Sequence, residues 1–233
     1  MSSTPTFTVI GHRGARGHAP ENTLLSIDTA IGLGAHWVEF DVQHHADELW
    51  LMHDLRLDRT TNGRGLLTDC DAETLRRLDA GNGEPIPTLR DALDLIEQRV
   101  GVNIELKSWN GCAAAVAACL RDYLAEGWPA SKLMVSSFHL PELWEFKQLL
   151  PEVPLGVLYC GVPLDWAGLA GELGARVLNI SAEFVDTKLI ADAHARGLKL
   201  NVYTVNDPED LKLMRALGVD GVFTDYPDRA LAL

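Results

Sequence analysis

Residues 198–224 read LKLNVYTVNDPEDLKLMRALGVDGVFT. An apolar run rich in β-branched residues at 198–205 is followed by a stretch with helical spacing of apolar residues at 208–217, and then by a second apolar run at 221–224. A strand, a helix and another strand in this order form a βαβ unit, in which the two strands lie parallel. This stretch therefore predicts a parallel sheet covered by helices.

The same alternation runs along almost the whole chain. Six further strand patterns precede this unit, at 7–11, 37–43, 102–106, 133–137, 155–159 and 177–180. The helical patterns before the last unit fall at 23–33, 88–99, 112–126, 141–150, 166–173 and 188–195. Eight strands in 233 residues fit a (β/α)8 TIM barrel, whose usual size is about 250 residues. A doubly wound open sheet is the alternative, but it usually has fewer strands, so we expect the α/β barrel.

One segment interrupts the alternation. A second strand pattern, at 48–53, directly follows the strand at 37–43, and a Gly-rich and polar segment then extends from 54 to 87. Turn signals occur within it at Asn62-Gly63 and Gly81-Asn82-Gly83. We therefore expect a single barrel domain over residues 1–233, with a small insertion at about 54–87 after the second barrel strand.

The charge of the chain narrows the possible partners. Lys and Arg together number 20 and Asp and Glu 33, so the formal net charge is −13. Nucleic acids and anionic membranes attract basic surfaces, and we therefore expect neither as a partner. A phosphate-bearing small molecule remains compatible with this charge, because a bound cation can reverse the local field.

Signals for secretion or membrane insertion are not visible in the sequence. No segment has the roughly 18 to 20 unbroken apolar residues of a membrane span. The start, MSSTPTFTVI, lacks a basic stretch followed by a long apolar run. The four cysteines form neither a CxxC pair nor a zinc-binding spacing, which indicates free thiols in a reducing compartment. We expect a cytoplasmic protein.

Charged and hydrogen-bonding residues gather where the predicted strands end. In a TIM barrel the catalytic groups lie at the C-terminal ends of the strands, so these positions form one site. The segments are Gly11-His12-Arg13-Gly14, Glu39-Phe40-Asp41, His53-Asp54, Glu105-Leu106-Lys107, Ser136-Ser137-Phe138-His139, Tyr203 to Asn206, and Thr224-Asp225. Most of the charged groups belong to the first half of the barrel.

Three carboxylates in these segments predict a metal site. Side chains alternate along a strand, so Glu39 and Asp41 share one face, and Glu105 and Lys107 share a face of the next barrel strand. The alternative is a salt-bridged pair on a solvated strand, but the apolar neighbours of Glu39 indicate burial on both faces. Buried carboxylates repel each other unless a cation lies between them. Oxygen ligands suit one divalent cation, Mg²⁺ or Ca²⁺, better than zinc.

Two histidines and two basic residues complete the candidate site. His12 and His53 are candidates for acid and base because histidine titrates near neutral pH, although a lone histidine at a strand end is often only structural. Arg13 and Lys107 are cations placed to bind an anion. Together with a metal, these groups indicate phosphoryl transfer or phosphodiester cleavage.

The order of the short motifs points to a known family. Eight motifs follow one another along the chain: His12-Arg13-Gly14, Pro20-Glu21-Asn22-Thr23, Glu39-Phe40-Asp41-Val42, His53-Asp54, Asp58-Arg59-Thr60-Thr61-Asn62-Gly63, Asn103-Ile104-Glu105-Leu106-Lys107, Ser136-Ser137-Phe138 and Tyr203-Thr204-Val205-Asn206. A last block extends from Gly218 to Pro227. In these motifs the chain resembles the glycerophosphodiester phosphodiesterases of the bacterial cytoplasmic type over nearly its whole length.

The resemblance implies a function and a role for each matching residue. Members of this family are metal-dependent TIM barrels that hydrolyse glycerophosphodiesters, such as glycerophosphocholine or glycerophosphoethanolamine, to glycerol 3-phosphate and an alcohol. The implied metal ligands are Glu39, Asp41 and Glu105, and the implied acid and base are His12 and His53. The implied substrate-binding residues are Arg13, Lys107, Glu21, Phe138 and Tyr203. The segment 54–87 matches the small insertion of the family and is expected to help shape the substrate mouth.

Two departures from the family pattern concern the alcohol side of the substrate. His44-His45-Ala46-Asp47 stands where a Thr commonly precedes the next Asp, and Tyr203 stands where Trp is frequent. Two alternative functions remain open: a lysophospholipase D or sphingomyelinase D-like phosphodiesterase on the same barrel, and a non-catalytic phosphate-binding barrel. The sequence also leaves open the head group, the order of the two histidines, the nucleophile (water or an internal hydroxyl) and a homo-oligomer.

Overall fold

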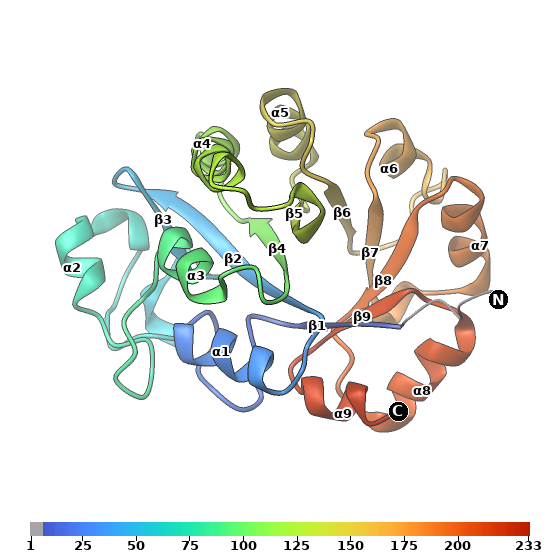
Figure 1. Cartoon of the computed structure of the whole chain (residues 1–233), viewed down its shortest axis with the longest axis horizontal. Helices are drawn as coiled ribbons and strands as arrows, with labels where there is room; N and C mark the ends of the chain where they lie inside the picture. Colours follow the sequence, from blue (N-terminus) through green and yellow to red (C-terminus); the bar gives the residue numbers. More distant parts are fainter. Residues whose placement is uncertain (1–6) are drawn as a thin grey trace.

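Short apolar segments form parallel strands that pair side by side into a closed barrel in the computed structural model, which describes residues 7–233 (Figure 1). Within those residues the barrel strands are β1 (Thr8–Gly11), β2 (Trp37–His45), β4 (Gly101–Leu106), β5 (Leu133–Ser137), β6 (Leu155–Tyr159), β7 (Val177–Ser181), β8 (Lys199–Tyr203) and β9 (Gly221–Thr224). Strand β1 pairs in parallel with both β9 and β2, which closes the barrel. The predicted (β/α)8 TIM barrel is therefore confirmed.

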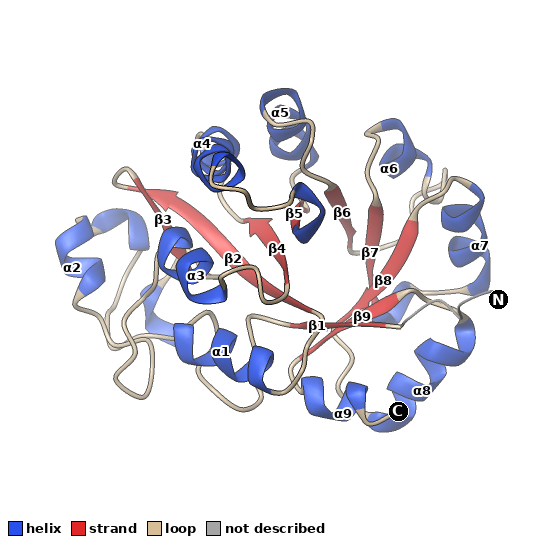
Figure 2. Cartoon of the chain, in the orientation of Figure 1, coloured by secondary structure: helices blue, strands red, loops and turns tan. Residues whose placement is uncertain are grey.

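Helices follow the strands and cover the outside of the barrel (Figure 2). They are α1 (Leu24–Gly32), α3 (Leu89–Ile96), α4 (Cys112–Ala125), α5 (Leu140–Leu149), α6 (Gly168–Glu172), α7 (Thr187–Ala195), α8 (Pro208–Leu217) and α9 (Pro227–Leu231). Local sequence sets several helix starts, because a side-chain oxygen satisfies a free backbone N–H of the first turn. Thr23 caps α1 in this way, Asp186 caps α7 and Asp207 caps α8.

Strand β2 shows how the core and the site share one strand. Val38, Phe40 and Val42 are buried and belong to the core between strands and helices. Glu39 and Asp41 alternate with them and therefore point to the barrel interior. The register of β2 against β4 places Asp41 opposite Glu105. The polar inner face of these two strands thus brings carboxylates together at the mouth of the barrel.

The insertion forms a small unit beside the barrel (Figure 1, teal, at the left). It follows β3 (Glu48–Leu51), which pairs antiparallel with the end of β2, and it contains η1 (Leu57–Arg59), η2 (Leu67–Asp69) and α2 (Ala72–Arg76). Its own buried cluster consists of Trp50, Met52, Leu57, Leu67, Leu75, Ala80 and Ile86. The insertion is therefore packed around a second small core.

Several predicted element boundaries are wrong by a few residues. Strand β2 continues to His45, two residues beyond the predicted end, because β3 supplies hydrogen-bonding partners for its last residues. Helix α3 ends at Ile96 and not at 99, because Glu97 and Gln98 adopt left-handed backbone angles with φ of 46° and 62°. The sequence patterns also did not predict the short helix α9.

The expectations about secretion, membrane spans and cysteines can be compared with the structure only for residues 7–233. The first six residues of the stretch searched for a secretion signal lie outside the described residues. In the described part, no helix combines the length and the apolar character needed to cross a membrane. Cys70, Cys112, Cys119 and Cys160 are all free thiols.

Gly14 allows the loop after β1 to approach helix α1 closely. Its φ is +81°, and a Cβ atom there would lie 2.4 Å from Ser26 Oγ and 2.5 Å from the Ser26 backbone carbon. The Gly14 N–H donates to the carbonyl of Glu39 at 3.0 Å. Glycine at this position therefore holds the first and second strand ends together, as only a residue without a Cβ can do here.

We expect Gly14→Ala to destabilise the protein well beyond a matched control. Gly65 also has a positive φ, +90°, but nothing lies within 4 Å of an added Cβ. Gly65→Ala should cost about 1–2 kcal/mol for left-handed strain alone, and Gly14→Ala should cost about 1–3 kcal/mol more through overpacking. Urea unfolding of both variants measures the difference. Equal losses would show that Ser26 can move aside without cost.

Candidate active site

The predicted site residues converge on a cavity of about 310 Å³ at the C-terminal ends of the strands. Its lining residues are His12, Arg13, Arg16, Glu39, His53, Glu105, Lys107, Phe138, Leu158, Tyr203, Thr204 and Phe223. All of the predicted site residues line it except Asp41 and Glu21, which contact residues that do. The structure therefore brings the predicted residues into one place.

Three buried carboxylates lie together at one side of this cavity. Glu39, Asp41 and Glu105 are only 2, 1 and 9% exposed, and one oxygen of each lies within 4.8 Å of the others. Glu39 Oε1 is buried and has no hydrogen-bond partner among residues 7–233. Such a charged group is costly to bury unless a cation compensates it. The donor set and the unpartnered oxygen both fit a bound divalent cation.

The pKa values of these carboxyls point to the same conclusion. Burial, followed by the charges of Asp41 and Glu105, raises the pKa of Glu39 well above its ordinary value. Burial and the charge of Asp41 raise the pKa of Glu105 to about 7, although Lys107 acts in the opposite direction. Without a cation, the cluster therefore tends to retain protons at neutral pH.

Two basic side chains face the carboxylates. Lys107 Nζ lies 2.8 Å from Glu105 Oε1 and 3.7 Å from Asp41 Oδ1. Arg13 Nε lies 3.2 Å from Asp41 Oδ2, yet this buried atom has no hydrogen bond of acceptable geometry. Both side chains also line the cavity. They can therefore neutralise part of the carboxylate charge and still present N–H groups to an anion.

Asn22 holds Asp41 in place. Its Nδ2 donates to Asp41 Oδ2 at 2.9 Å, and its Oδ1 accepts from the Asp41 backbone N–H at 3.1 Å. Asn22 has φ of 58°, a left-handed backbone conformation that asparagine tolerates better than most residues. Sequence reasoning assigned Asn22 no role of its own, although it belongs to the quoted motif Pro20-Glu21-Asn22-Thr23.

His12 is oriented by a carboxylate from the last barrel strand. Its Nδ1 lies 2.7 Å from Asp225 Oδ1, and Asp225 Oδ2 accepts from Asn206 Nδ2 at 2.8 Å. Burial opposes the effect, but the hydrogen bond with His12 lowers the pKa of Asp225 below its ordinary value. An ionised Asp225 fixes the proton on Nδ1 and leaves Nε2 for proton transfer. Sequence reasoning did not identify Asp225 and Asn206 as partners of His12.

His53 has an equivalent carboxylate partner in its neighbour. Its Nδ1 lies 2.6 Å from Asp54 Oδ1. Burial lowers the pKa of His53, while the charge of Asp41 and the hydrogen bond with Asp54 oppose this shift. A lowered pKa favours the neutral imidazole near pH 7, which is the form that accepts a proton.

Glu21 lies behind the cavity and not in its wall. It accepts from Arg13 Nη1 at 2.7 Å and from both Nη atoms of Arg59 at 2.9 and 2.8 Å. Burial would raise its pKa, but the hydrogen bonds from Arg59 and the charge of Arg13 lower the pKa of Glu21 to about 2. Glu21 therefore stays ionised and braces Arg13.

Aromatic side chains form an apolar part of the cavity wall. Phe138 and Tyr203 meet edge to face with ring centroids 5.8 Å apart, and Tyr203 meets Phe223 in the same way at 6.4 Å. Lys107 Nζ lies 5.8 Å from the Phe138 ring centroid. Leu158 and Phe223 were not predicted as site residues, because an apolar residue within a strand pattern reads as core.

The inserted segment does not line the cavity. None of the described residues in its wall comes from 54–87. The expectation that the insertion shapes the substrate mouth directly is therefore wrong for this cavity. The second half of the barrel supplies that wall instead, through Phe138, Leu158, Tyr203 and Phe223.

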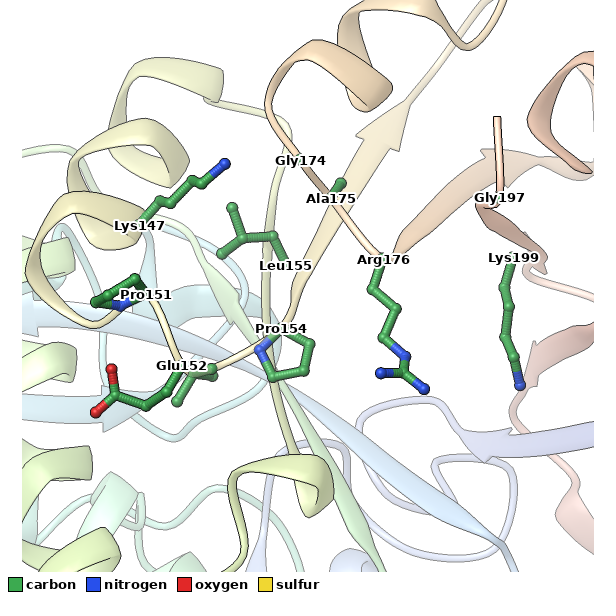
Figure 3. Close-up of a pocket in the computed structure, with 11 residues that line it drawn as sticks. Lys147, Pro151, Glu152, Pro154, Leu155, Gly174, Ala175, Arg176, Gly197 and Lys199 are labelled. Atoms are coloured by element: carbon green, nitrogen blue, oxygen red, sulfur yellow. The ribbon is translucent and has the colours of Figure 1, made fainter. Parts of the chain in front are cut away.

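A larger hollow of about 450 Å³ lies at the other end of the strands (Figure 3). Arg176 and Lys199, which flank the starts of β7 and β8, extend in the same direction there, while Lys147 extends the other way (Figure 3). Among the described residues that line it, Glu152 is the only carboxylate and there is no histidine. The chemistry of acid, base and metal ligand therefore selects the smaller cavity.

Comparisons with known proteins find similar phosphodiesterases. A model described as the glycerophosphoryl diester phosphodiesterase family matches residues 12–229. A glycerophosphodiester phosphodiesterase of Bacillus altitudinis is 34% identical over 237 residues, with 97% of each chain covered. One of Caldanaerobacter subterraneus subsp. tengcongensis is 35% identical over 239 residues, covering 97% of this chain and 96% of the relative.

Solved structures show the same fold. A phosphodiesterase of Oleispira antarctica, in complex with the product sn-glycerol-3-phosphate, is 35% identical and has a TM-score of 0.89, covering 97% of this chain and 95% of that chain. A glycerophosphodiester phosphodiesterase of Agrobacterium tumefaciens is 28% identical, with a TM-score of 0.83 and coverage of 98% and 100%. Because the family model matches nearly the whole chain, including the residues that line the cavity, the protein belongs to the glycerophosphoryl diester phosphodiesterase family.

Proposed function

We propose that the protein hydrolyses small glycerophosphodiesters, such as glycerophosphocholine or glycerophosphoethanolamine, to glycerol 3-phosphate and an alcohol. The observation that carries this proposal is the cavity itself, where three buried carboxylates, two basic side chains and two carboxylate-bound histidines meet. Membership of the family supports it, as does the glycerol 3-phosphate bound by the Oleispira antarctica relative.

Glu39, Asp41 and Glu105 would hold one divalent cation. Their oxygens suit the hard cations Mg²⁺ and Ca²⁺, and both fit this donor set. When bound, the cation supplies Lewis-acid polarisation of a phosphate oxygen and a template for the substrate. Its charge also offsets the repulsion among the three buried carboxylates.

Arg13 and Lys107 would bind the remaining phosphate oxygens. Both line the cavity next to the carboxylates and carry N–H donors. Charge that shifts onto these oxygens in the transition state is then stabilised by groups already in place. The aromatic pair of Phe138 and Tyr203 gives the glycerol carbons or a choline group an apolar surface, and a quaternary ammonium gains additional attraction from aromatic faces.

His12 and His53 would move the protons. The lowered pKa of His53 favours it as the base that takes a proton from water or from the glycerol hydroxyl of the substrate. His12, held by Asp225, would then donate a proton to the departing alkoxide. The cytoplasmic location, the single-domain organisation, an assembly into homo-oligomers and the lack of nucleic-acid or membrane partners stay predictions.

We expect metal binding to strengthen as the pH rises. Because burial and Asp41 raise the pKa of Glu105 to about 7, a cation must displace protons below that pH. Mg²⁺ affinity, measured by calorimetry on chelator-treated protein, should increase between pH 6 and 8, with proton release at the lower pH.

Glu39→Gln should lower turnover by at least about 10²-fold. Full turnover in EDTA, or affinity independent of pH, would contradict the assignment.

Removing either histidine should reduce turnover strongly. We expect His12→Ala and His53→Ala each to lower kcat by roughly 10² to 10⁴, the usual contribution of an acid or base. The double variant should lose much less than the product, because both groups serve one reaction. His194→Ala is a control, since His194 pairs with Asp220 at 2.9 Å and does not line the cavity. Near-native turnover in either site variant would make that histidine structural.

Phe138→Ala should weaken substrate binding more than the chemical step. Phe138 is 44% exposed and forms part of the cavity wall, so removing its ring takes away contact area and leaves the charged groups in place. A loss of about 1–2 kcal/mol of apolar contact corresponds to a KM about 5- to 30-fold higher. Steady-state kinetics with glycerophosphocholine test this. A drop in kcat at unchanged KM would assign Phe138 to the transition state.

A further inference from the structure

A continuous series of charged contacts joins the two sides of the active site through the insertion. Its members, in order, are Arg13, Glu21, Arg59, Asp54 and His53. Arg13 Nη1 donates to Glu21 at 2.7 Å, and His53 Nδ1 lies 2.6 Å from Asp54. Arg59 occupies the centre and connects the two carboxylates.

All three nitrogens of the Arg59 guanidinium are used. Nη1 and Nη2 form a fork onto Glu21 at 2.9 and 2.8 Å, and Nε donates to Asp54 Oδ2 at 2.6 Å. A planar guanidinium is suited to this arrangement, because its donors lie at fixed angles. Arg59 therefore sets the relative position of Glu21 and Asp54, although its own side chain is 46% exposed.

The insertion core holds the backbone of Arg59. Leu57, two residues earlier in η1, is 1% exposed and belongs to the small core of the insertion. The Leu57 N–H donates to the Gly65 carbonyl at 2.9 Å, and Thr61 Oγ1 donates to the Leu57 carbonyl at 2.8 Å. The buried leucine and these two bonds fix the short helix from which Arg59 extends.

We propose that Arg59 is a positioning residue for the reaction and that the insertion acts on the site through it. Through Glu21 it holds Arg13 against the phosphate, and through Asp54 it holds the imidazole of His53. This role gives a reason for the packed core of the insertion, although the insertion does not line the cavity. The inference rests on the hydrolysis proposed above.

The loss of Arg59 should affect proton transfer and phosphate binding together. Glu21 and Asp54 would each lose a charged donor, and the two carboxylates would then repel each other. Hydrogen bonds from Arg59 also keep the pKa of Asp54 below its ordinary value, which maintains its charge beside His53. Among the described contacts, none joins Arg59 directly to Glu39, Asp41 or Glu105, so Mg²⁺ affinity should change much less than activity.

The test compares three variants on glycerophosphocholine. Arg59→Ala should lower kcat/KM by about 10- to 100-fold, the range for removing a group that orients a functional residue. Arg59→Lys should recover part of this loss, since an ammonium reaches one carboxylate but cannot form the fork. Arg56→Ala is the matched control. Arg56 precedes η1, its side chain is 61% exposed and, within residues 7–233, it forms an ion pair only with Asp58, so the activity of this variant should stay within about twofold.

Two further readouts separate positioning from a general loss of structure. Arg59→Ala should stay fully folded at the assay temperature, with only a small fall in melting temperature from the lost ion pairs, and its Mg²⁺ affinity should change much less than its kcat/KM. Asp54→Asn should also reduce kcat, and the double variant Arg59→Ala/Asp54→Asn should lose clearly less than the product of the single losses, because the two residues form one unit.

The outcomes distinguish this inference from the proposed function. A wild-type protein that does not cleave glycerophosphocholine would overturn the proposed function before any variant is compared. If the wild type is active, wild-type kcat/KM in Arg59→Ala would overturn the positioning role. An activity loss that only reflects unfolded Arg59→Ala protein at the assay temperature, or equal losses in Arg59→Ala and Arg56→Ala, would overturn it as well.

Discussion

The mutual repulsion of three buried carboxylates is the constraint on which the rest of the site depends. Alternation along β2 and the register of β2 against β4 bring Glu39, Asp41 and Glu105 to the same end of the barrel, within 4.8 Å of one another. Such a cluster is stable only with compensating charge. Lys107 and Arg13 supply part of it, and the rest requires a bound cation or retained protons.

The two halves of the barrel supply different parts of the active site. The charged groups lie on β1 to β4 or directly after these strands, while the apolar wall comes from β6, β8, β9 and the residue that follows β5. One carboxylate far along the chain completes the first half: Asp225, 213 residues from His12, binds the His12 imidazole. His12 and His53 thus each have a carboxylate beside Nδ1. Asn206 binds the carboxylate of Asp225, and Arg59 binds that of Asp54.

Much of the fold and the site was predictable because it follows from local rules. The alternation of strand and helix patterns predicted the barrel, and the two-residue spacing of Glu39 and Asp41 predicted their common face. Long-range side-chain contacts were not predictable, since the pairing of His12 with Asp225 or of Glu21 with Arg59 depends on how loops fold. For the same reason, the polar composition of the insertion did not reveal the contacts of Arg59 with Glu21 and Asp54.

The most direct test of the central claim is crystallographic. Crystals of the protein grown with Mn²⁺, which prefers the same oxygen ligands, should show one anomalous-scattering peak bounded by Glu39, Asp41 and Glu105. At least one oxygen of each residue should then lie about 2.0–2.6 Å from the ion, the range for hard cations. A cluster that holds no ion at saturating Mn²⁺, with the three carboxyls instead paired through shared protons, would contradict a metal site here.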